Sequence, residues 1–291
     1  MGSSPPTAVV TDTTCYLDPG LDATRELSMV SLYVGTDGNQ QRESEITDFA
    51  AFFERLRASE EGANTSQPSV GDFISAYEPL LEEGREIVSI HLSAGISGTF
   101  QSASQAREKL LDEGRGGEQI HVYDSRSAGG GMGLVVLAAL AASRSGADAA
   151  GVVERAEEAR GQLQMWFAVD TLEYLRKGGR IGAARAMLGS ALQIKPILTL
   201  EEEITPVERV RTRRRAFERL VFHAGELAEK GFDGWVVQHI QDSEGAERLV
   251  GECREIFGSG PVFVSEVGPV IGAHAGPGLL GVGAIRRSLL D

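Results

Sequence analysis

The sequence predicts an α/β protein: an N-terminal domain with a parallel sheet flanked by helices, plus a C-terminal α+β domain with a mixed sheet. Up to residue 146, apolar runs of strand length alternate with segments of helical periodicity, a pattern typical of parallel sheets covered on both faces. Beyond residue 162 the strand candidates lie closer together, and a short acidic turn at 201–203 indicates a hairpin. The chain of 291 residues is long enough for two domains, which we expect at 1–155 and 156–291.

The strands of the first half are short apolar runs, and the first of them ends in Asp12. The segments between them repeat apolar residues at helical spacing. Thr47 or Asp48 is suited to cap the first helix, and Ser69 with Asp72 resembles a capping box for the second. In order, we expect a strand at 7–12, a strand at 29–34, a helix at 47–60, a loop at 62–69, a helix at 70–84, a strand at 86–92, a helix at 98–114, a strand at 119–124 and a helix at 133–146.

The second half combines strand and helix candidates without regular alternation. Apolar runs predict strands at 162–170, 195–200, 204–210 and 234–240, and helical periodicity covers 171–190, 212–230 and 243–257. This mixture is typical of an α+β domain with a mixed sheet.

The composition limits the classes of function. Lys and Arg number 28 against 42 Asp and Glu, a net charge of −14, which opposes non-specific binding to nucleic acid or to an anionic membrane. The most apolar stretch, 132–142, is shorter than the ~20 residues that span a bilayer. The opening MGSSPPTAVVTDTT has no secretory pattern, and Cys15 and Cys253 have no metal-ligand spacing. We therefore expect a cytoplasmic protein with two free thiols.

Four loops rich in small and hydroxyl residues fall where the expected strands end: 12–14, 65–69, 93–99 and 124–133. Ligands bind parallel sheets at this edge. In the loop SAGISGT, Ser93 and Ser97 offer hydroxyl groups, and Gly98 offers a backbone N–H at the start of a helix. Thr65 offers another hydroxyl group ahead of a different helix. Neutral donors of this kind suit a single carboxylate better than a phosphate.

The hydroxyl groups of this loop also fit two different roles. Ser and Thr cap helices in many proteins, so the hydroxyl groups could be purely structural. Ser97 could also be the nucleophile of a serine hydrolase or esterase with His274 as its base, although SAGISGT lacks the G-x-S-x-G pattern. Asp12 or Asp124 would then be the orienting acid.

Other site classes find little support. The dipeptide Gly-Lys occurs nowhere, which excludes a P-loop. GPGLLG at 276–281 matches G-x-G-x-x-G, but the acid expected about 20 residues later would lie beyond Asp291. The five histidines are scattered and form no ligand cluster. We expect neither a cofactor nor a metal.

Seven short motifs follow one another along the chain: TSQPS, SAGISGT, DSRSAGGGMG, LEYLRKGGRIG, IKPILTL, VRTRRRA and GAHAGPG. With them the chain resembles the DegV family of bacterial fatty-acid-binding proteins, from VVTDTT near the start to GVG near the end. The resemblance implies a long-chain fatty acid, such as palmitate, stearate or oleate, between or within two α/β-type domains. It also implies that the protein is not an enzyme and presents the fatty acid to a separate fatty acid kinase for phospholipid synthesis.

The resemblance assigns the fatty-acid carboxylate to Thr65 of the TSQ motif and Ser97 of the SGT motif, with His274 nearby. Ser93 and Gly98 belong to the same loop as Ser97 and are expected at the same site. No catalytic residue is implied.

Some positions depart from the commoner family pattern. Ala94 and Ile96 replace a serine and a leucine of the S-S-x-L-S-G-T loop, and Ala273 and Ala275 replace threonines that flank the histidine. The lost hydroxyl groups are expected to weaken the hydrogen-bond network around His274 and so the affinity for the head group.

Two basic stretches stand out against the acidic background, and they contribute Arg176, Lys177 and Arg180 from LRKGGR, and Arg209, Arg211 and Arg213 from ERVRTRRR. They could be a solvated face, a docking surface for the kinase, or charge near the acyl carboxylate. We expect a monomer. The apolar tail of the ligand needs a wall of side chains such as those of FISAYEPLL, GLVVLAALAA and AMLGSALQI, but segments of this kind are more often ordinary core, and the sequence does not separate the two.

Overall fold

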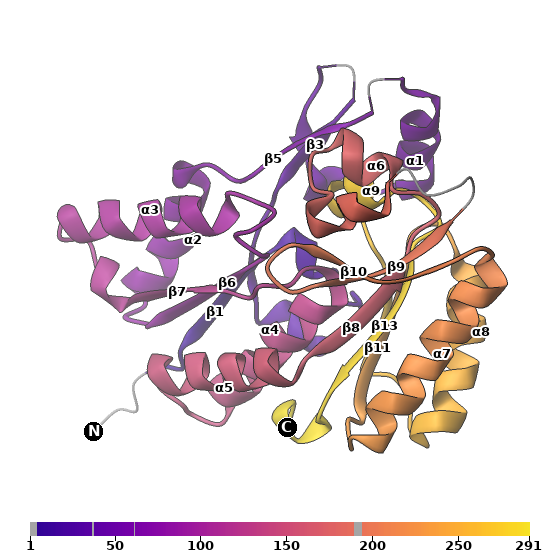
Figure 1. Cartoon of the computed structure of the whole chain (residues 1–291). Helices are drawn as coiled ribbons and strands as arrows, with labels where there is room; N and C mark the ends of the chain where they lie inside the picture. The colour runs from indigo at the N-terminus through magenta and orange to yellow at the C-terminus, as the bar shows by residue number, and fades with distance from the viewer. Residues whose placement is uncertain (1–4, 37, 61, 189–193) are drawn as a thin grey trace.

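The computed structural model describes residues 5–36, 38–60, 62–188 and 194–291, and Figure 1 shows how the elements are arranged. Four strands form a wholly parallel sheet in the order β2-β1-β6-β7. Their bounds are Ser28–Val30 for β2, Ala8–Asp12 for β1, Ile87–His91 for β6 and Ile120–Asp124 for β7. The parallel sheet predicted for the first half is confirmed.

Helices cover both faces of this sheet: α2 (Val70–Glu82), α3 (Thr99–Asp112), α4 (Gly129–Arg144) and α5 (Ala149–Gln162). Alternate residues of a strand point to opposite faces, so Ala8 and Val10 of β1 pack with α2 and α3, whereas Val9 packs in the core that holds α4 and α5. Ser69 and Asp72 form the predicted capping box at the start of α2.

A second sheet has six strands in the order β10-β9-β8-β13-β11-β12, antiparallel except for the β11–β12 pair. The bounds are Ile204–Val210 for β10, Lys195–Leu200 for β9, Gln164–Ala168 for β8, Leu280–Ile285 for β13, Gly234–His239 for β11 and Phe263–Glu266 for β12. The mixed sheet and its β9–β10 hairpin are as predicted. Helices α7 (Arg213–Glu229) and α8 (Ser243–Phe257) cover one face, and α4 contacts strands β11 and β13 (Figure 1).

A small antiparallel sheet was not predicted; its order is β4-β3-β5, with bounds Gln41–Arg42, Tyr33–Gly35 and Asn64–Ser66. The single strand expected at 29–34 is wrong, because the chain leaves the parallel sheet after Val30 and pairs again only from Tyr33. The loop expected at 62–69 contains β5 instead. Its polar residues gave no apolar pattern, since the pairing uses backbone groups alone.

Three helices lie near this small sheet: α1 (Phe49–Ala58), α6 (Glu173–Lys177) and α9 (Pro269–Ala275) (Figure 1). Asp48 caps α1, since its carboxylate accepts a hydrogen bond from Ala51 N at 2.9 Å. Within the helical stretch expected at 171–190, the structure has α6 and a 3₁₀ segment, Gly182–Met187, and residues 189–193 lie outside the described ranges.

Several elements were missed or misplaced. The sequence pattern did not predict α5, α9, β12 or β13, and α4 begins at Gly129 rather than at 133 because its three glycines form the first turn. Strand β13 contains Gly281 and Gly283, which usually disfavour strands. Here they allow close packing, since a Cβ on Gly283 would lie 2.8 Å from Met165 Cβ of β8.

One hydrophobic core joins the two sheets. It includes Val9 of the first sheet, Val135 of α4 and Val236 of the second sheet. Residue 155, where we expected the domain boundary, lies inside α5. Cys15 and Cys253 are buried and unpaired, as predicted. No helix in the described ranges has the length and apolarity needed to cross a membrane.

His223 of α7 is a buried histidine whose ring stacks on Trp166 with 4.0 Å between ring centroids. Neither ring nitrogen has a hydrogen-bond partner among the described residues, and Glu226 Oε2 lies 3.7 Å from Nδ1. Burial, assisted by the charges of Lys230 and Arg219, lowers the pKa of His223 to about 4.

We expect His223→Phe to raise the free energy of unfolding at pH 7 by roughly 1–2 kcal/mol, because it removes two unsatisfied nitrogens and keeps the aromatic stack. The folded-state pKa lies below the ordinary value of 6.5, so the unfolded chain takes up the proton first. The titration of His223 therefore costs no stability above pH 6.5, and it destabilises the fold progressively as the pH falls to about 4. Thermal unfolding of both proteins across this range measures the effect. If the melting temperatures of the two proteins fell equally between pH 6.5 and pH 4, this result would contradict the prediction.

Candidate ligand-binding site

An apolar cavity lies between the two sheets. Its walls include Met165 and Phe167 of β8, Leu200 and Ile204 of the β9–β10 hairpin, and Ile271 of α9. The cavity encloses about 1010 Å³ of space free of atoms, part of it open to solvent. Ligand pockets in proteins are likewise lined mainly by apolar side chains.

Three of the predicted carboxylate-binding residues meet at this cavity: Thr65 from β5, Ser97 from the loop before α3, and His274 from α9. Thr65 Oγ1 and His274 Nε2 are 2.8 Å apart, which is hydrogen-bond distance. Ser97 Oγ lies 2.9 Å from Thr99 Oγ1 and accepts a hydrogen bond from Thr99 N at 3.3 Å. The apolar cavity therefore has a small polar region built from hydroxyl groups and an imidazole.

His274 fits tightly into its place. A Cβ on Gly178 would lie 2.0 Å from His274 Nδ1, so only glycine at position 178 leaves room for the ring. Nδ1 is buried and has no hydrogen-bond partner within the described ranges. Burial, together with the charge of Arg180, lowers the pKa of His274 to about 4. The imidazole is therefore neutral at pH 7.

Ser93 and Gly98 lie beside the cavity rather than in its wall. The Ser93 hydroxyl donates to Glu202 O at 2.7 Å and accepts from Gly95 N at 3.2 Å. Gly98 stands at the start of α3, where a Cβ would come within 3.0 Å of Gln67 Nε2. Both residues shape the loop that carries Ser97. The contact with Gln67, a residue of the TSQ motif, was not anticipated.

Among the predicted basic residues, Arg180 alone lines the cavity. Its Nε donates to Ile96 O at 3.2 Å, so the guanidinium lies on the SAGISGT loop. Arg176 pairs with Glu173, and Lys177 donates to Glu60 O at 2.9 Å. The sequence left Arg180 open between a solvated face, a docking surface and charge near the carboxylate, since the turn at Gly178 that brings it to the loop gives no periodic signal.

The second basic stretch lies away from the cavity. Arg209 and Arg211 are exposed, and Arg213 forms ion pairs with Asp170 at 3.2 Å and Asp242 at 3.3 Å. Asp170 immediately precedes the segment that contains α6, so Arg213 is tied to the region of the first basic stretch.

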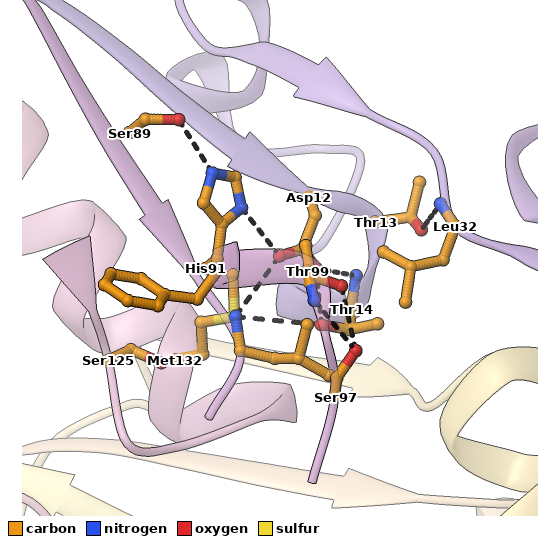
Figure 2. A network of polar contacts seen from close by, with 12 residues as sticks. Asp12, Thr13, Thr14, Leu32, Ser89, His91, Ser97, Thr99, Ser125 and Met132 are labelled. Carbon is orange, nitrogen blue, oxygen red and sulfur yellow. Dashed lines mark hydrogen bonds and ion pairs between the residues drawn. The ribbon is translucent and has the colours of Figure 1, made fainter. Parts of the chain in front are cut away.

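A buried polar network lies behind the SAGISGT loop (Figure 2). Asp12 Oδ2 lies 3.0 Å from His91 Nδ1 and accepts from Leu92 N at 3.2 Å. Asp12 Oδ1 accepts from Thr14 Oγ1 at 2.5 Å. On its other side His91 Nε2 lies 2.7 Å from Ser89 Oγ. The network fixes the end of β6, where the loop begins.

This arrangement does not assemble the alternative serine hydrolase site. Asp12 is bonded to His91, and Ser97 is bonded to Thr99 (Figure 2). Asp124 Oδ1 accepts from the backbone N–H groups of Ala94 and Arg126. Within the described ranges, no hydrogen bond connects Ser97 to a histidine.

The segments expected to line the cavity with apolar side chains mostly do not. Phe73 and Tyr77 of FISAYEPLL belong to the core between α2, α3 and the parallel sheet. Leu134 and Val135 of GLVVLAALAA belong to the core between the sheets. Most of AMLGSALQI falls at 189–193, outside the described residues. Apolar periodicity alone does not separate a cavity wall from a core.

The fold and the cavity define an α/β protein of two sheets with an apolar pocket that ends in hydroxyl groups and a neutral imidazole. The chain belongs to the DegV family, whose model, described as "Uncharacterised protein, DegV family", matches residues 6–287. A DegV domain-containing protein of Halalkalibacterium halodurans is 37% identical over 282 residues, which covers 94% of this chain and 96% of that protein.

Two solved structures are similar over almost their whole length. One, from Thermus thermophilus, is a DegV family protein described by its fatty acid binding; it has 33% identity and a TM-score of 0.85, and covers 97% of this chain and 99% of that one. The other is DegV from Bacillus subtilis, described as a fatty acid binding protein. It also has 33% identity and a TM-score of 0.85, and the similarity covers 97% of this chain and 100% of that one.

Proposed function

We propose that this protein binds a long-chain fatty acid in the apolar cavity, with the carboxylate held by Thr65 and Ser97 beside His274. The observation that carries the proposal is the placement of these three residues at one apolar cavity. Similar proteins described as fatty-acid binders support it. The protein then acts as a carrier and performs no chemistry itself.

A neutral His274 has two tautomers, and the tautomer determines which way its hydrogen bond with Thr65 runs. If Nε2 carries the proton, it donates to Thr65 Oγ1, and the Thr65 hydroxyl proton is free to donate to the carboxylate. Ser97 gains the same freedom, because Thr99 N donates to its oxygen. The positive charge of Arg180 at the cavity favours the anion further.

The tail supplies most of the affinity in this proposal. A saturated C16 chain buries about 14 methylenes at roughly 0.8 kcal/mol each, on the order of 11 kcal/mol before losses. Ordering of the chain and loss of free motion offset several kcal/mol of this gain. The hydroxyl groups at Thr65 and Ser97 therefore set the orientation of the ligand and distinguish an acid from an uncharged lipid.

We expect Thr65→Val and Ser97→Ala each to lower the affinity for palmitate roughly 10- to 100-fold, because each removes a hydrogen bond to a charged group worth about 1.5–3 kcal/mol. Titration with a fluorescent fatty acid, followed by displacement with palmitate, measures this. Thr24→Val and Ser104→Ala are matched controls, since their hydroxyl groups bond to the backbone outside the cavity.

Mass spectrometry of the purified protein tests the proposal directly. A stoichiometric C14–C18 fatty acid is the expected finding. A protein that arrives empty and stays empty when offered fatty acids would overturn the proposal. Labelling of Ser97 by a fluorophosphonate probe would then favour the hydrolase.

The family resemblance extends the proposal to a partner. We place the docking surface for a fatty acid kinase on the exposed arginines Arg209 and Arg211, together with Arg176, Lys177 and Arg213. The double variant Arg209→Glu with Arg211→Glu should abolish acyl-phosphate formation by such a kinase and leave palmitate affinity unchanged. Equal kinase activity with both proteins would exclude this surface.

A further inference from the structure

Helix α9, which carries His274, is held at its start by two buried residues from the other half of the chain. Val270 N donates to Glu43 Oε1 at 2.7 Å, and Ile271 N donates to the Tyr16 hydroxyl at 3.2 Å. The Tyr16 hydroxyl in turn donates to Glu43 Oε1 at 2.6 Å. The first backbone groups of α9 are therefore bound to one connected pair of side chains.

The fit around this contact leaves no room for α9 to slide. A Cβ on Gly268 would lie 2.7 Å from Tyr16 Cε1 and 2.9 Å from Glu43 Oε1. A Cβ on Gly272 would lie 2.4 Å from two atoms of the Phe53 ring. Such short approaches require another atom to move, so α9 rests directly on these three side chains.

Tyr16 is itself fixed. Its backbone oxygen accepts from Ser265 Oγ at 2.5 Å, and burial raises the pKa of its hydroxyl well above the usual range, so the hydroxyl keeps its proton. Tyr16 also has a φ of 40°, in the left-handed region that bulky residues seldom adopt. A strained backbone at a buried tyrosine is held there by its surroundings.

The anchor lies one helical turn from the site. Val270 and His274 are four positions apart, so they lie on one side of α9 and move together with it. At the far end, His274 Nε2 is 2.8 Å from Thr65 Oγ1, and a shift of a few tenths of an ångström changes that hydrogen bond. Neither Tyr16 nor Glu43 lines the cavity.

We propose that Tyr16 and Glu43 are positioning residues for the carboxylate site: they anchor the start of α9 and thereby hold His274 against Thr65. This inference rests on the proposed function, since it concerns recognition of the fatty-acid head group. The pair acts through α9 and touches no ligand.

The test compares two tyrosine-to-phenylalanine variants. Tyr16→Phe removes the hydroxyl that joins Glu43 and Ile271, whereas Tyr123→Phe removes a buried hydroxyl on β7 that has no hydrogen-bond partner among the described residues. Both substitutions keep the ring and the backbone preference. Each variant is titrated with palmitate and with 1-hexadecanol, which has the same tail and no carboxylate.

We expect Tyr16→Phe to weaken palmitate binding about 5- to 10-fold and to leave hexadecanol binding within about twofold, a loss of roughly 1 kcal/mol confined to the head group. Tyr123→Phe should leave the ratio of the two affinities at the wild-type value. Equal losses for both lipids in Tyr16→Phe, or no loss for either, would overturn the inference. Wild-type protein that binds neither lipid would overturn the proposed function instead.

A second variant and a measurement without ligand make the test independent of folding yield. Glu43→Leu removes the acceptor of both hydrogen bonds and should show the same selective loss of palmitate affinity. In ligand-free protein, the imidazole NMR signals of His274 should shift in Tyr16→Phe and stay in place in Tyr123→Phe. Unchanged His274 signals in Tyr16→Phe count against the inference.

Discussion

Replacement of Asp12 by alanine is expected to lower the free energy of unfolding by about 3–5 kcal/mol, the range measured when one member of a buried polar pair is removed. Asp12 is wholly buried and accepts from Thr14 and Leu92 while it contacts His91. Alanine leaves these donors without an acceptor in a place that water cannot reach. Denaturation in urea, followed by circular dichroism, measures the loss.

The control for this prediction is Asp22→Ala. Asp22 is 92% exposed and forms an ion pair with Arg25 at 3.9 Å. Exposed pairs of this kind contribute about 0–1 kcal/mol, so the variant should unfold close to the wild-type midpoint. If Asp12→Ala lost less than about 1 kcal/mol, the network behind the loop would have no structural importance.

The second large effect is expected for Gly178→Ala, which should reduce palmitate affinity at least tenfold. The new Cβ would lie 2.0 Å from His274 Nδ1, so the ring must move away from Thr65. The backbone itself accepts alanine, because Gly178 has φ −73° and ψ −6°. The loss therefore reports the displacement of His274 rather than strain in the turn. Displacement titration with palmitate measures it.

Gly251→Ala is the matched control for this substitution. Gly251 lies in α8, and a Cβ there meets no atom within 4 Å. Alanine in a helix stabilises it by up to about 1 kcal/mol relative to glycine, and palmitate affinity should not change. Wild-type affinity in Gly178→Ala would mean that the position of His274 is unimportant for head-group binding.

The sequence pattern predicted the central strands β1 and β6 of the parallel sheet well, because they are buried on both faces and read as mainly apolar runs. The sequence pattern did not predict strands whose formation depends on backbone groups rather than on apolar side chains. Strand β5 is polar and pairs through its peptide groups, and β13 needs Gly281 and Gly283 to lie close to β8. Neither feature leaves a periodic apolar signal.

The site was predicted in part. Thr65, Ser97 and His274 lie together at the cavity, and the motifs that contain them pointed to one ligand. The cavity wall could not be read from the sequence, because Met165 and Ile271 come from distant segments and resemble ordinary core residues. The position of Arg180 depends on a turn, and the anchor of α9 depends on contacts between residues more than two hundred positions apart.

The place of β13 in the second sheet has a consequence for synthesis of the chain. Strand β8 pairs with β13, although β8 ends at residue 168 and β13 begins at 280. At roughly 5–20 residues per second, a ribosome needs on the order of ten seconds to make the ~110 residues between them. During that time the edge of β8 has no partner from β13, and the wall of the cavity is open. The nascent chain can enclose a ligand only after almost its whole length has been translated.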